Sequence, residues 1–545
     1  MALDASLVRS VREWIAADPD PLTRAEAQSL LDAHDSVGLV DRFGASLRFG
    51  TAGLRGALGA GPNRMNRLVV RRAAAGLADY LVRTDASCRT RGVVIAHDAR
   101  HGSAEFAMDS ARVFAARGIR ARLLPALVPT PVLAWSVTEL GASAGVMVTA
   151  SHNPPQDNGY KVYLADGAQI VAPHDSNIAE HIEAVGLDVA LAPDDRVLVE
   201  RVDTSIIDRY ADFAAAVRLV PSVGGVPVAA TALHGVGGGL LAAVFERAGF
   251  AAPITVSEQQ VPDADFPTVP FPNPEEPGAM DRVIALARAS GAALALANDP
   301  DADRLGVAIP DRAGSTTEAD RAAVAWRRLT GDEIGWLLAD HILRHTSGSD
   351  RLVVTTLVSS SMLARLAAAH GVHHIETFTG FKWIARAMLD HPELRFVFGY
   401  EQALGYLVAQ RPLDKDGISA AVLMAEVAAC AAAEGSTIEE RLRVIRSTFG
   451  DLRTAERSIR MSPAESSRRV ASLAQHPPRE VSGYAVTAVE HVVAADLLRL
   501  WCGSARLQVR PSGTEAKVKL YVESEGVDPT LLLDGLDAVV SGTST

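Results

Sequence analysis

The stretch GVMVTASHNPP, at 145–155, is a short apolar strand that runs directly into a polar loop. Upstream of it, RGVVIA at 91–96 predicts another strand, and 103–117 has helical spacing that Gly118 ends. A strand, a helix and a further strand in this order are typical of an α/β fold with a parallel or mixed sheet.

The same alternation restarts twice downstream. Residues 226–232 predict a strand, which HGVGGG at 234–239 and a helix follow, and 292–297 predict the next strand. A third round begins near residue 330 with a helix and a strand at 351–356. Each round has the composition of one α/β unit.

The last hundred residues are different, since they end in two strands within RLQVRPSGTEAKVKLYVE at 506–523. We therefore predict an α/β protein with three similar α/β domains and a smaller C-terminal α+β domain. The predicted ranges are 1–205, 206–318, 319–447 and 448–545.

Composition limits the possible partners and compartments. A hydrophobic fraction of 48% and a charged fraction of 22% are typical of a soluble globular protein. The formal charge of −12 and 5% aromatic content argue against a nucleic-acid partner. Three widely spaced cysteines and an N-terminus without a secretion signal indicate a reducing, cytoplasmic location. The longest apolar run, 420–433, contains Glu426 and predicts a buried helix, so no membrane partner is expected.

Ser151 stands in TASHNP, where the predicted strand ends. A hydroxyl held by the scaffold at this point can accept and return a phosphoryl group. Serine-hydrolase chemistry is a weaker alternative for Ser151. The sequence is not a GxSxG elbow, and adjacent Ser and His cannot easily form the usual nucleophile–base bond. An ordinary polar turn fits the same residues, because Ser, His, Asn and Pro are all common in turns.

Asp299, Asp301 and Asp303 alternate in NDPDADR after an apolar strand. Three adjacent carboxylates repel one another unless a cation or solvent relieves them. Oxygen ligands suit Mg²⁺, which keeps coordination positions open for water or phosphate. An EF-hand is excluded because Arg304 and Pro310 stand where its Gly and Glu belong. A solvated acidic turn is the alternative.

Two further loops carry groups suited to a sugar phosphate. Glu401 in GYEQALGY can accept hydrogen bonds from sugar hydroxyls, and Lys415 in LDKDG can meet a phosphate, although a strand-end turn fits as well. Arg510 and the hydroxyls and backbone N–H groups of the following PSGT suit a phosphate cradle or a hairpin turn.

Three glycine-containing segments complete the set. GLRG at 53–56 and TGFK at 379–382 are cationic loops that fit an anionic substrate. HGVGGG does not match a dinucleotide-binding GxGxxG, because Leu240 occupies the place of the third glycine.

The order of these motifs resembles the α-D-phosphohexomutase superfamily over residues 45–525. TASHNP, DPDADR, the Glu-containing GYEQALGY loop and RPSGTE follow one another in that family's order. FGTAGLRG, GPNRMN, TGFKWI and DKDGISA are similar to its phosphoglucomutase/phosphomannomutase branch, which includes phosphopentomutases and a sugar-bisphosphate synthase. The resemblance implies four domains around a central cleft, each contributing one loop.

The resemblance also implies roles for particular residues. Mg²⁺ would be held by Ser151, as a phosphoserine, with Asp299, Asp301 and Asp303. The implied catalytic residues are Ser151, His152, Lys161 and Arg55. The implied substrate-binding residues are Arg304, Thr379, Gly380, Lys382, Glu401, Lys415, Arg510, Ser512, Gly513 and Thr514. As a general acid/base, Lys161 requires nearby cations that lower its pKa. Arg55, His152 and Arg304 would form a positive wall.

The implied reaction interconverts hexose 1-phosphate and hexose 6-phosphate, with glucose or mannose as the sugar, through a sugar 1,6-bisphosphate. A phosphopentomutase, a glucose-1,6-bisphosphate synthase and a non-catalytic sugar-phosphate-binding protein remain alternatives, as does a phosphate-releasing hydrolase. Ala403 stands where some relatives have Ser, which leaves the sugar preference open, and Ala516 replaces the usual Pro after the phosphate loop. The expected partner is a small sugar phosphate, bound by a monomer or homodimer.

Overall fold

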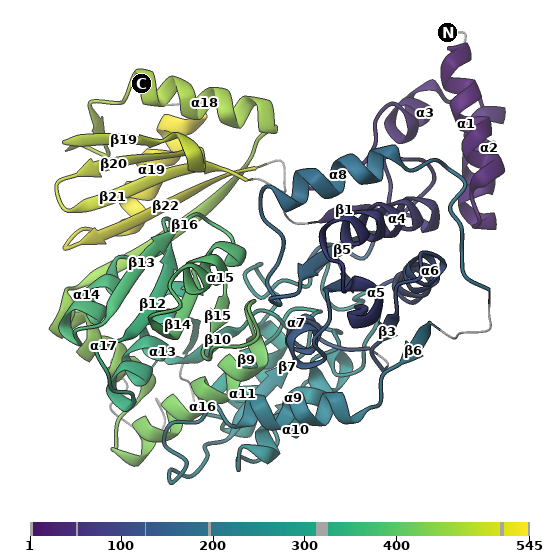
Figure 1. The fold of residues 1–545 in the computed structure, drawn as a ribbon. Helices are drawn as coiled ribbons and strands as arrows, with labels where there is room; N and C mark the ends of the chain where they lie inside the picture. The colour runs from purple at the N-terminus through teal and green to yellow at the C-terminus, as the bar shows by residue number, and fades with distance from the viewer. Residues whose placement is uncertain are drawn as a thin grey trace. The chain divides into compact units, whose positions relative to one another are not determined.

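The computed structural model describes residues 4–50, 53–125, 127–193, 198–311, 325–512 and 517–542 (Figure 1). It contains two compact units. The first unit comprises residues 1–328 and 404–433, and the second comprises 329–403 and 434–545. Each unit has hydrophobic cores of its own.

Three helices open the first unit. They are α1 (Ala5–Ala17), α2 (Pro21–Asp32) and α3 (Ser36–Phe43). An Asp immediately before each helix accepts a backbone N–H of its first turn, which satisfies a donor that has no partner inside the helix. The helices share a small apolar core with Val11, Leu31 and Leu39.

The first sheet of this unit has the order β1-β5-β4-β2-β3-β6. Its strands are β1 (Leu54–Ala57), β2 (Val93–His97), β3 (Ala121–Leu123), β4 (Ala144–Val148), β5 (Asp157–Leu164) and β6 (Val199–Arg201). Its helices are α4 (Arg67–Thr84), α5 (Cys88–Arg91), α6 (Ser103–Ala116), α7 (Thr130–Glu139) and α8 (His174–Ala184). β2, β3, β4 and β6 run parallel, whereas β5 is antiparallel to its neighbours β4 and β1. The β4 strand is buried along its whole length, which explains its continuous apolar sequence.

The second sheet has the order β11-β10-β9-β7-β8. Its strands are β7 (Val228–Thr231), β8 (Ile254–Thr255), β9 (Leu294–Ala297), β10 (Gly306–Asp311) and β11 (Ala325–Arg328). The accompanying helices are α9 (Ser205–Ala215), α10 (Gly238–Arg247), η1 (Ser257–Gln259) and α11 (Asp281–Ser290). β10 reverses direction after the Asp-rich loop and pairs antiparallel with β9. The two strands therefore hold both ends of that loop.

The first unit also takes in a segment that the sequence analysis placed within 319–447, namely β15 (Gly405–Leu407) and α16 (Gly417–Ala433). The predicted buried helix is found as α16, which is buried from Gly417 to Ala431, whereas Ala432 and Ala433 at its end are exposed. α16 lies against α9, α10 and β9, and Figure 1 shows it beside α9 and α10. A helix that is apolar on every side needs cover on every side, which explains why it joins this unit.

The second unit contains a parallel sheet and an antiparallel one. The parallel part is β13-β12-β14, formed by β12 (Arg351–Thr356), β13 (His373–Thr377) and β14 (Arg395–Glu401). Its helices are α13 (Gly331–His345), α14 (Met362–Ala369), α15 (Phe381–Asp390) and α17 (Ile438–Phe449). A capping box at Thr330 and Glu333 starts α13.

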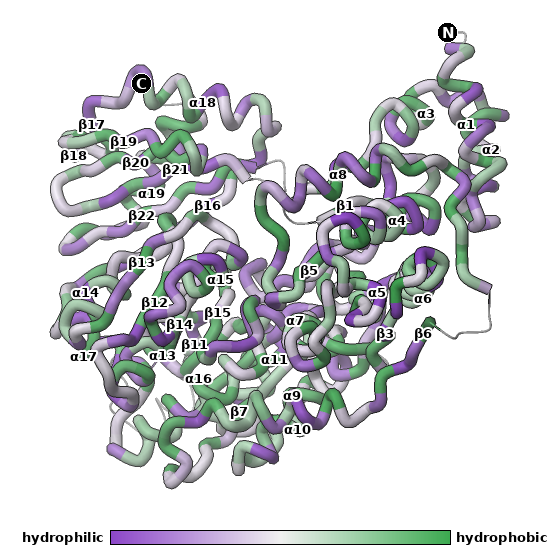
Figure 2. The backbone as a smooth tube through the Cα atoms, in the orientation of Figure 1, coloured by the Kyte–Doolittle hydropathy of each residue, from purple (hydrophilic) through white to green (hydrophobic). Residues whose placement is uncertain are grey.

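The antiparallel sheet has the order β16-β22-β21-β20-β19. Its strands are β16 (Leu452–Arg460), β19 (Ala488–Val492), β20 (Leu497–Cys502), β21 (Ala505–Pro511) and β22 (Lys517–Glu525). α18 (Pro463–Gln475) and α19 (Pro529–Ser541) pack on it, and β17 (Glu480–Val481), β18 (Tyr484–Ala485) and η2 (Val493–Ala495) lie between. Figure 2 shows α8 and α18 as largely hydrophilic helices.

The predicted fold class is confirmed: three α/β parts precede a smaller α+β part. The domain limits stay a prediction, and the limit at 318 lies outside the described residues. Within the described part of the chain, no single helix is both long and apolar enough to cross a membrane, although α16 and α17 meet those requirements as a bent pair.

Candidate active site

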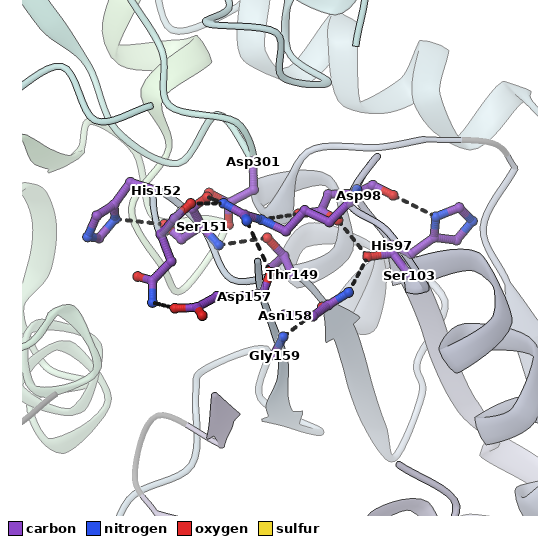
Figure 3. A network of polar contacts seen from close by, with 12 residues as sticks. His97, Asp98, Ser103, Thr149, Ser151, His152, Asp157, Asn158, Gly159 and Asp301 are labelled. Carbon is purple, nitrogen blue, oxygen red and sulfur yellow. Dashed lines mark hydrogen bonds and ion pairs between the residues drawn. The ribbon is translucent and has the colours of Figure 1, made fainter. Parts of the chain in front are cut away.

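Ser151 lies just beyond β4 in a tightly held conformation. Its φ of +54° falls in the left-handed region that non-glycine residues rarely adopt. Its N–H donates to Thr149 Oγ1 at 2.9 Å, and its Oγ lies 3.2 Å from His152 Nδ1. Figure 3 shows both neighbouring side chains turned toward Ser151. Its Oγ also donates to Asp299 Oδ2 at 2.9 Å, so the predicted nucleophile meets the predicted metal loop.

The three aspartates of that loop form one buried cluster. Asp299, Asp301 and Asp303 are 0% exposed, and one carboxylate oxygen of each lies within 4.8 Å of the others. The pKa of Asp299 is raised well above its usual value. Burial is the largest cause, and the negative charges of Asp301 and Asp303 add to it. Among the residues that the structure describes, none donates a hydrogen bond to Asp301 Oδ1 or Asp303 Oδ1. Buried carboxylate oxygens in need of a cation fit Mg²⁺.

Short-range contacts fix the shape of the metal loop. Ala302 has a φ of +54°, and its N–H donates to the Asp299 carbonyl oxygen at 2.8 Å. The Arg304 N–H donates to Asp299 Oδ1 at 3.0 Å, and Thr130 Oγ1 donates to Asp301 Oδ2 at 2.6 Å. The aspartate oxygens are therefore oriented by the protein itself.

HGVGGG packs directly against this loop. The Val236 N–H donates to the Pro300 carbonyl oxygen at 2.8 Å. A Cβ on Gly235 would lie 2.3 Å from Pro300 Cα, and one on Gly237 would lie 2.6 Å from Ala302 Cβ. These glycines permit close approach to the metal loop.

Two lysines contact the same carboxylates. Lys161 on β5 places Nζ 2.8 Å from Asp301 Oδ2 and 3.1 Å from Asp303 Oδ2. Lys415 Nζ lies 2.8 Å from Asp303 Oδ2. The structure thus brings Lys415, which the sequence analysis assigned to the substrate, to the metal loop.

The expected lowering of the Lys161 pKa is wrong for this structure. Burial lowers the pKa of Lys161, as does the charge of Lys415, but the carboxylates of Asp301 and Asp303 outweigh both and raise it. Sequence alone could not give this sign, because it depends on which charges lie nearest in space.

The positive wall consists of arginines. Arg55 Nη1 donates to Asn153 Oδ1 at 3.1 Å, and Arg304 Nη1 donates to Glu275 Oε2 at 3.1 Å. The pKa of His152 is lowered well below its usual value. Burial is the largest cause, and the positive charges of Arg304 and Arg55 add to it. His152 is therefore neutral near pH 7 and adds no positive charge there, contrary to the expectation.

The remaining predicted residues belong to the second unit. Glu401 is buried at the end of β14, and Gly380, with a φ of +113°, follows Thr379 and precedes α15. Lys382 Nζ lies 6.0 Å from the centroid of the Trp383 ring. Arg510 is the last residue but one of β21, and the N–H of Ser512 donates to the Lys517 carbonyl oxygen at 2.8 Å. Gly513 and Thr514 lie outside the described residues.

Sequence reasoning missed Arg100. This residue follows β2 in HDAR and donates from its guanidinium to backbone carbonyl oxygens of the Ser151 loop. The available signal was an Asp and an Arg directly after a buried strand, since residues at strand ends commonly form sites. It was weak without knowledge that β2 and β4 are neighbours.

Comparisons with known proteins agree with this geometry. Three models of phosphoglucomutase/phosphomannomutase α/β/α domains match the chain, domain I at 46–187, domain II at 208–314 and domain III at 330–447. A "Probable phosphomannomutase" of Haemophilus influenzae is 39% identical, covering 85% of this chain and 94% of that protein.

The chain belongs to the phosphoglucomutase/phosphomannomutase family.

A further relative supports the family assignment, and a solved structure shares the fold. A "Probable phosphoribomutase" of Schizosaccharomyces pombe is 33% identical, covering 96% of this chain and 94% of that protein. A solved structure of a phosphoglucomutase/phosphomannomutase family protein from Burkholderia thailandensis shares the fold, with a TM-score of 0.69 and 20% identity over 91% of this chain and 97% of that one. The predicted membership of the α-D-phosphohexomutase superfamily is confirmed. This phosphoglucomutase/phosphomannomutase family member is an enzyme of the isomerase class, an intramolecular phosphotransferase.

Proposed function

We propose that this phosphomutase interconverts hexose 1-phosphate and hexose 6-phosphate, with glucose, mannose or both as the sugar. The transfer proceeds through phospho-Ser151 and a sugar 1,6-bisphosphate. The observation that carries the proposal is the 2.9 Å contact between Ser151 Oγ and Asp299 Oδ2, beside two buried carboxylate oxygens that accept no hydrogen bond from the described part of the chain.

The proposed metal ligands are an oxygen of phospho-Ser151 and the carboxylates of Asp299, Asp301 and Asp303. Magnesium at this position would neutralise negative charge that accumulates around a phosphoryl group. The orientation of Asp299 and Asp301 by Arg304 and Thr130 supports the ligand set, because preformed oxygen ligands require little rearrangement.

Each phosphoryl transfer exchanges one oxygen–phosphorus bond for another. The bond between Ser151 Oγ and phosphorus breaks while the free sugar hydroxyl forms a bond to the same phosphorus. The hydroxyl loses a proton and Ser151 Oγ gains one. The bisphosphate then reorients, and its other phosphoryl group returns to Ser151 with the reverse proton movement.

We assign the proton transfers to Lys161. Its Nζ is buried and donates hydrogen bonds to Asp301 and Asp303. These residues belong to the metal loop, which Ser151 also contacts through Asp299. The ammonium form, which the raised pKa favours, can supply the proton that Ser151 Oγ takes up, and the amine left behind then accepts the proton that the sugar hydroxyl loses. Positioning and charge neutralisation supply most of the remaining rate acceleration in reactions of this type.

Substrate-binding residues are proposed for each unit by itself. In the first unit, Arg55, His152, Arg304 and Lys415 are proposed to contact the phosphates and sugar. In the second unit, the proposed residues are Thr379, Gly380, Lys382, Glu401, Arg510, Ser512, Gly513 and Thr514. We propose that the domains carrying these residues end at 205, 318 and 447, as the sequence predicts.

The sugar is the main open choice, and the relatives carry names for both mannose and ribose chemistry. A phosphopentomutase therefore stays the second candidate, and a glucose-1,6-bisphosphate synthase the third. Membership of an enzyme family removes the non-catalytic binding protein from the alternatives.

The test is a mutase assay of the purified protein with Mg²⁺ and a trace of glucose 1,6-bisphosphate. Glucose, mannose and ribose 1-phosphates are compared for wild type, Ser151→Ala and Ser136→Ala. Ser136 is a matched buried serine on α7 whose hydroxyl donates to the Val132 carbonyl oxygen. We expect hexose conversion in wild type and Ser136→Ala, none in Ser151→Ala, and one phosphate by intact mass that only Ser151→Ala lacks.

Other outcomes would change the assignment. Preference for ribose 1-phosphate would select the phosphopentomutase, net accumulation of bisphosphate the synthase, and release of free phosphate a hydrolase. An active, unphosphorylated Ser151→Ala would contradict the covalent scheme.

A further inference from the structure

The guanidinium of Arg100 is bonded to four backbone carbonyl oxygens of the loop that carries Ser151. Nη2 donates to the carbonyl oxygens of Ser151 at 2.6 Å and Asn153 at 2.5 Å. Nη1 donates to those of Pro154 at 2.7 Å and Asp157 at 3.1 Å. One side chain therefore spans the loop from Ser151 to the start of β5.

Asp98 and Phe266 hold the Arg100 side chain in place. It is 4% exposed, and its Nε lies 3.3 Å from Asp98 Oδ2. Asp98 Oδ1 accepts the Arg100 N–H at 3.0 Å and the Ser103 hydroxyl at 2.8 Å. The Arg100 guanidinium lies 4.9 Å from the ring centroid of Phe266, which closes the other side. A group held this firmly can impose a shape on what it binds.

The bound loop needs such a restraint. Ser151 has a φ of +54°, a strained conformation for a non-glycine residue that persists only where the surrounding structure holds it. All four contacts of the Arg100 Nη atoms go to main-chain oxygens. Arg100 therefore acts on the loop backbone, and through the backbone on the direction of Ser151 Oγ.

We infer that Arg100 is a positioning residue for phosphoryl transfer, which holds the backbone of 151–157 so that Ser151 Oγ stays directed at Asp299. This inference deepens the proposed function and rests on it. A lysine cannot replace Arg100 fully, because one ammonium with three N–H groups cannot reach four oxygens arranged around a planar fork.

The test compares Arg100→Lys with Arg351→Lys. Arg351 is a matched control in the second unit: it is buried and donates to the carbonyl oxygens of Gly348, Leu343, Thr346 and His370 at 2.9–3.2 Å. Both substitutions remove the same kind of contact, but only one removes it from the Ser151 loop. The stability of each variant is measured by urea unfolding, so that activity is compared at a known loss of stability.

The readouts separate positioning from general stability. For Arg100→Lys we expect kcat to fall about 10- to 100-fold with KM nearly unchanged, because a small displacement of the reacting oxygen slows the chemical step. Hydrogen exchange of the Ser151, Asn153 and Asp157 amides, which are hydrogen-bonded within the loop, should become faster. Arg351→Lys should leave kcat and these amides unchanged.

Several results would overturn the inference. One is an Arg100→Lys enzyme with wild-type kcat and wild-type exchange in 151–157. Another is an equal loss of kcat in both variants at equal loss of stability. If Arg100→Lys does not fold, Phe266→Leu removes only the ring beside the guanidinium; a lowered kcat at constant KM supports the inference, and an unchanged kcat overturns it. Failure of the proposed function is distinct, since wild type would then lack mutase activity while the exchange measurement still reports on Arg100.

Discussion

At the scale of single residues, Asp332 links the stability of the second unit to pH. It is the second residue of α13 and is buried. Its Oδ1 accepts both the Ser360 N–H and the Tyr400 hydroxyl at 2.8 Å. Burial outweighs these bonds and raises the pKa of Asp332 from its ordinary 3.8 to about 7.

The sign of the pH effect follows from the two pKa values. Between pH 4 and 7 the folded state binds the Asp332 proton more tightly than the unfolded state, so stability falls as pH rises through this window. Asp332→Asn keeps the Oδ1 acceptor and removes the charge. We expect it to flatten this part of the pH profile and to raise the free energy of unfolding at pH 8 by roughly 2–4 kcal/mol.

Urea unfolding at pH 5 and pH 8 checks the prediction. Asp390→Asn is the control, because Asp390 is exposed at the end of α15. If wild type and Asp332→Asn lost the same stability between the two pH values, Asp332 would not be the titrating group.

Some residues of the site could be predicted from the sequence, and others could not. Ser151 and the three aspartates could be predicted because each lies in a short motif whose chemistry comes from consecutive residues. Arg100 could not, because its role depends on β2 lying next to β4 and on carbonyl oxygens that any sequence possesses. The pKa directions of Lys161 and His152 also needed distances between residues far apart in the chain.

At the scale of elements, the contact between HGVGGG and the metal loop is sterically demanding. A Cβ on Gly235 would lie 2.3–2.7 Å from three backbone atoms of Pro300. Gly239, in the first turn of α10, has no heavy atom within 4 Å of the position of its Cβ. The two glycines therefore offer one intolerant and one tolerant position in the same segment.

We predict that Gly235→Ala displaces the metal loop and that Gly239→Ala does not. Gly235→Ala should lower the free energy of unfolding by about 1–3 kcal/mol, as overpacking does, and weaken Mg²⁺ binding. Gly239→Ala should leave Mg²⁺ binding unchanged and stabilise α10 by up to about 1 kcal/mol. Calorimetric titration with Mg²⁺ and urea unfolding measure both effects, and equal Mg²⁺ affinities in the two variants would contradict the prediction.

Most elements near the site follow from local pattern. The expected strands at 91–96 and 351–356 and the helix at 103–117 are found as β2, β12 and α6. The membership of α16 in the first unit did not follow, although its burial did. Periodicity reports how much of a helix is covered, and it carries no information about which other elements cover it.

At the scale of the whole molecule, the first unit is assembled from two separate pieces of chain. The second piece contributes more than α16. Its Leu404 carbonyl oxygen accepts the Leu305 N–H at 3.0 Å, and buried Glu426 accepts from Arg218 Nε at 3.0 Å. Lys415 reaches Asp303. Residues 1–328 therefore lack part of their core and part of the metal-loop surroundings.

We predict that residues 1–328 alone do not fold cooperatively. Joining them to 404–433 through a Gly/Ser linker of about eight residues, which spans on average about 15 Å, should restore folding and Mg²⁺ binding. The linker is sufficient because Arg328 pairs with Ala308 and Leu404 bonds to Leu305, and these two partners are only three residues apart in the chain. Circular dichroism melting and calorimetric titration compare the two proteins, and a cooperative melt of 1–328 alone would refute the prediction.

Because residues 404–433 come late in the chain, the first unit cannot be completed until long after residue 328 has been synthesised. From residue 328 to residue 433 the ribosome must add 105 residues, which takes roughly 5–20 s at about 5–20 residues per second. During that interval the surfaces of α9, α10 and β9 that α16 will cover face the solvent of the exit site. The N-terminal part of this enzyme consequently exposes aggregation-prone apolar surface until nearly four-fifths of the chain has been made.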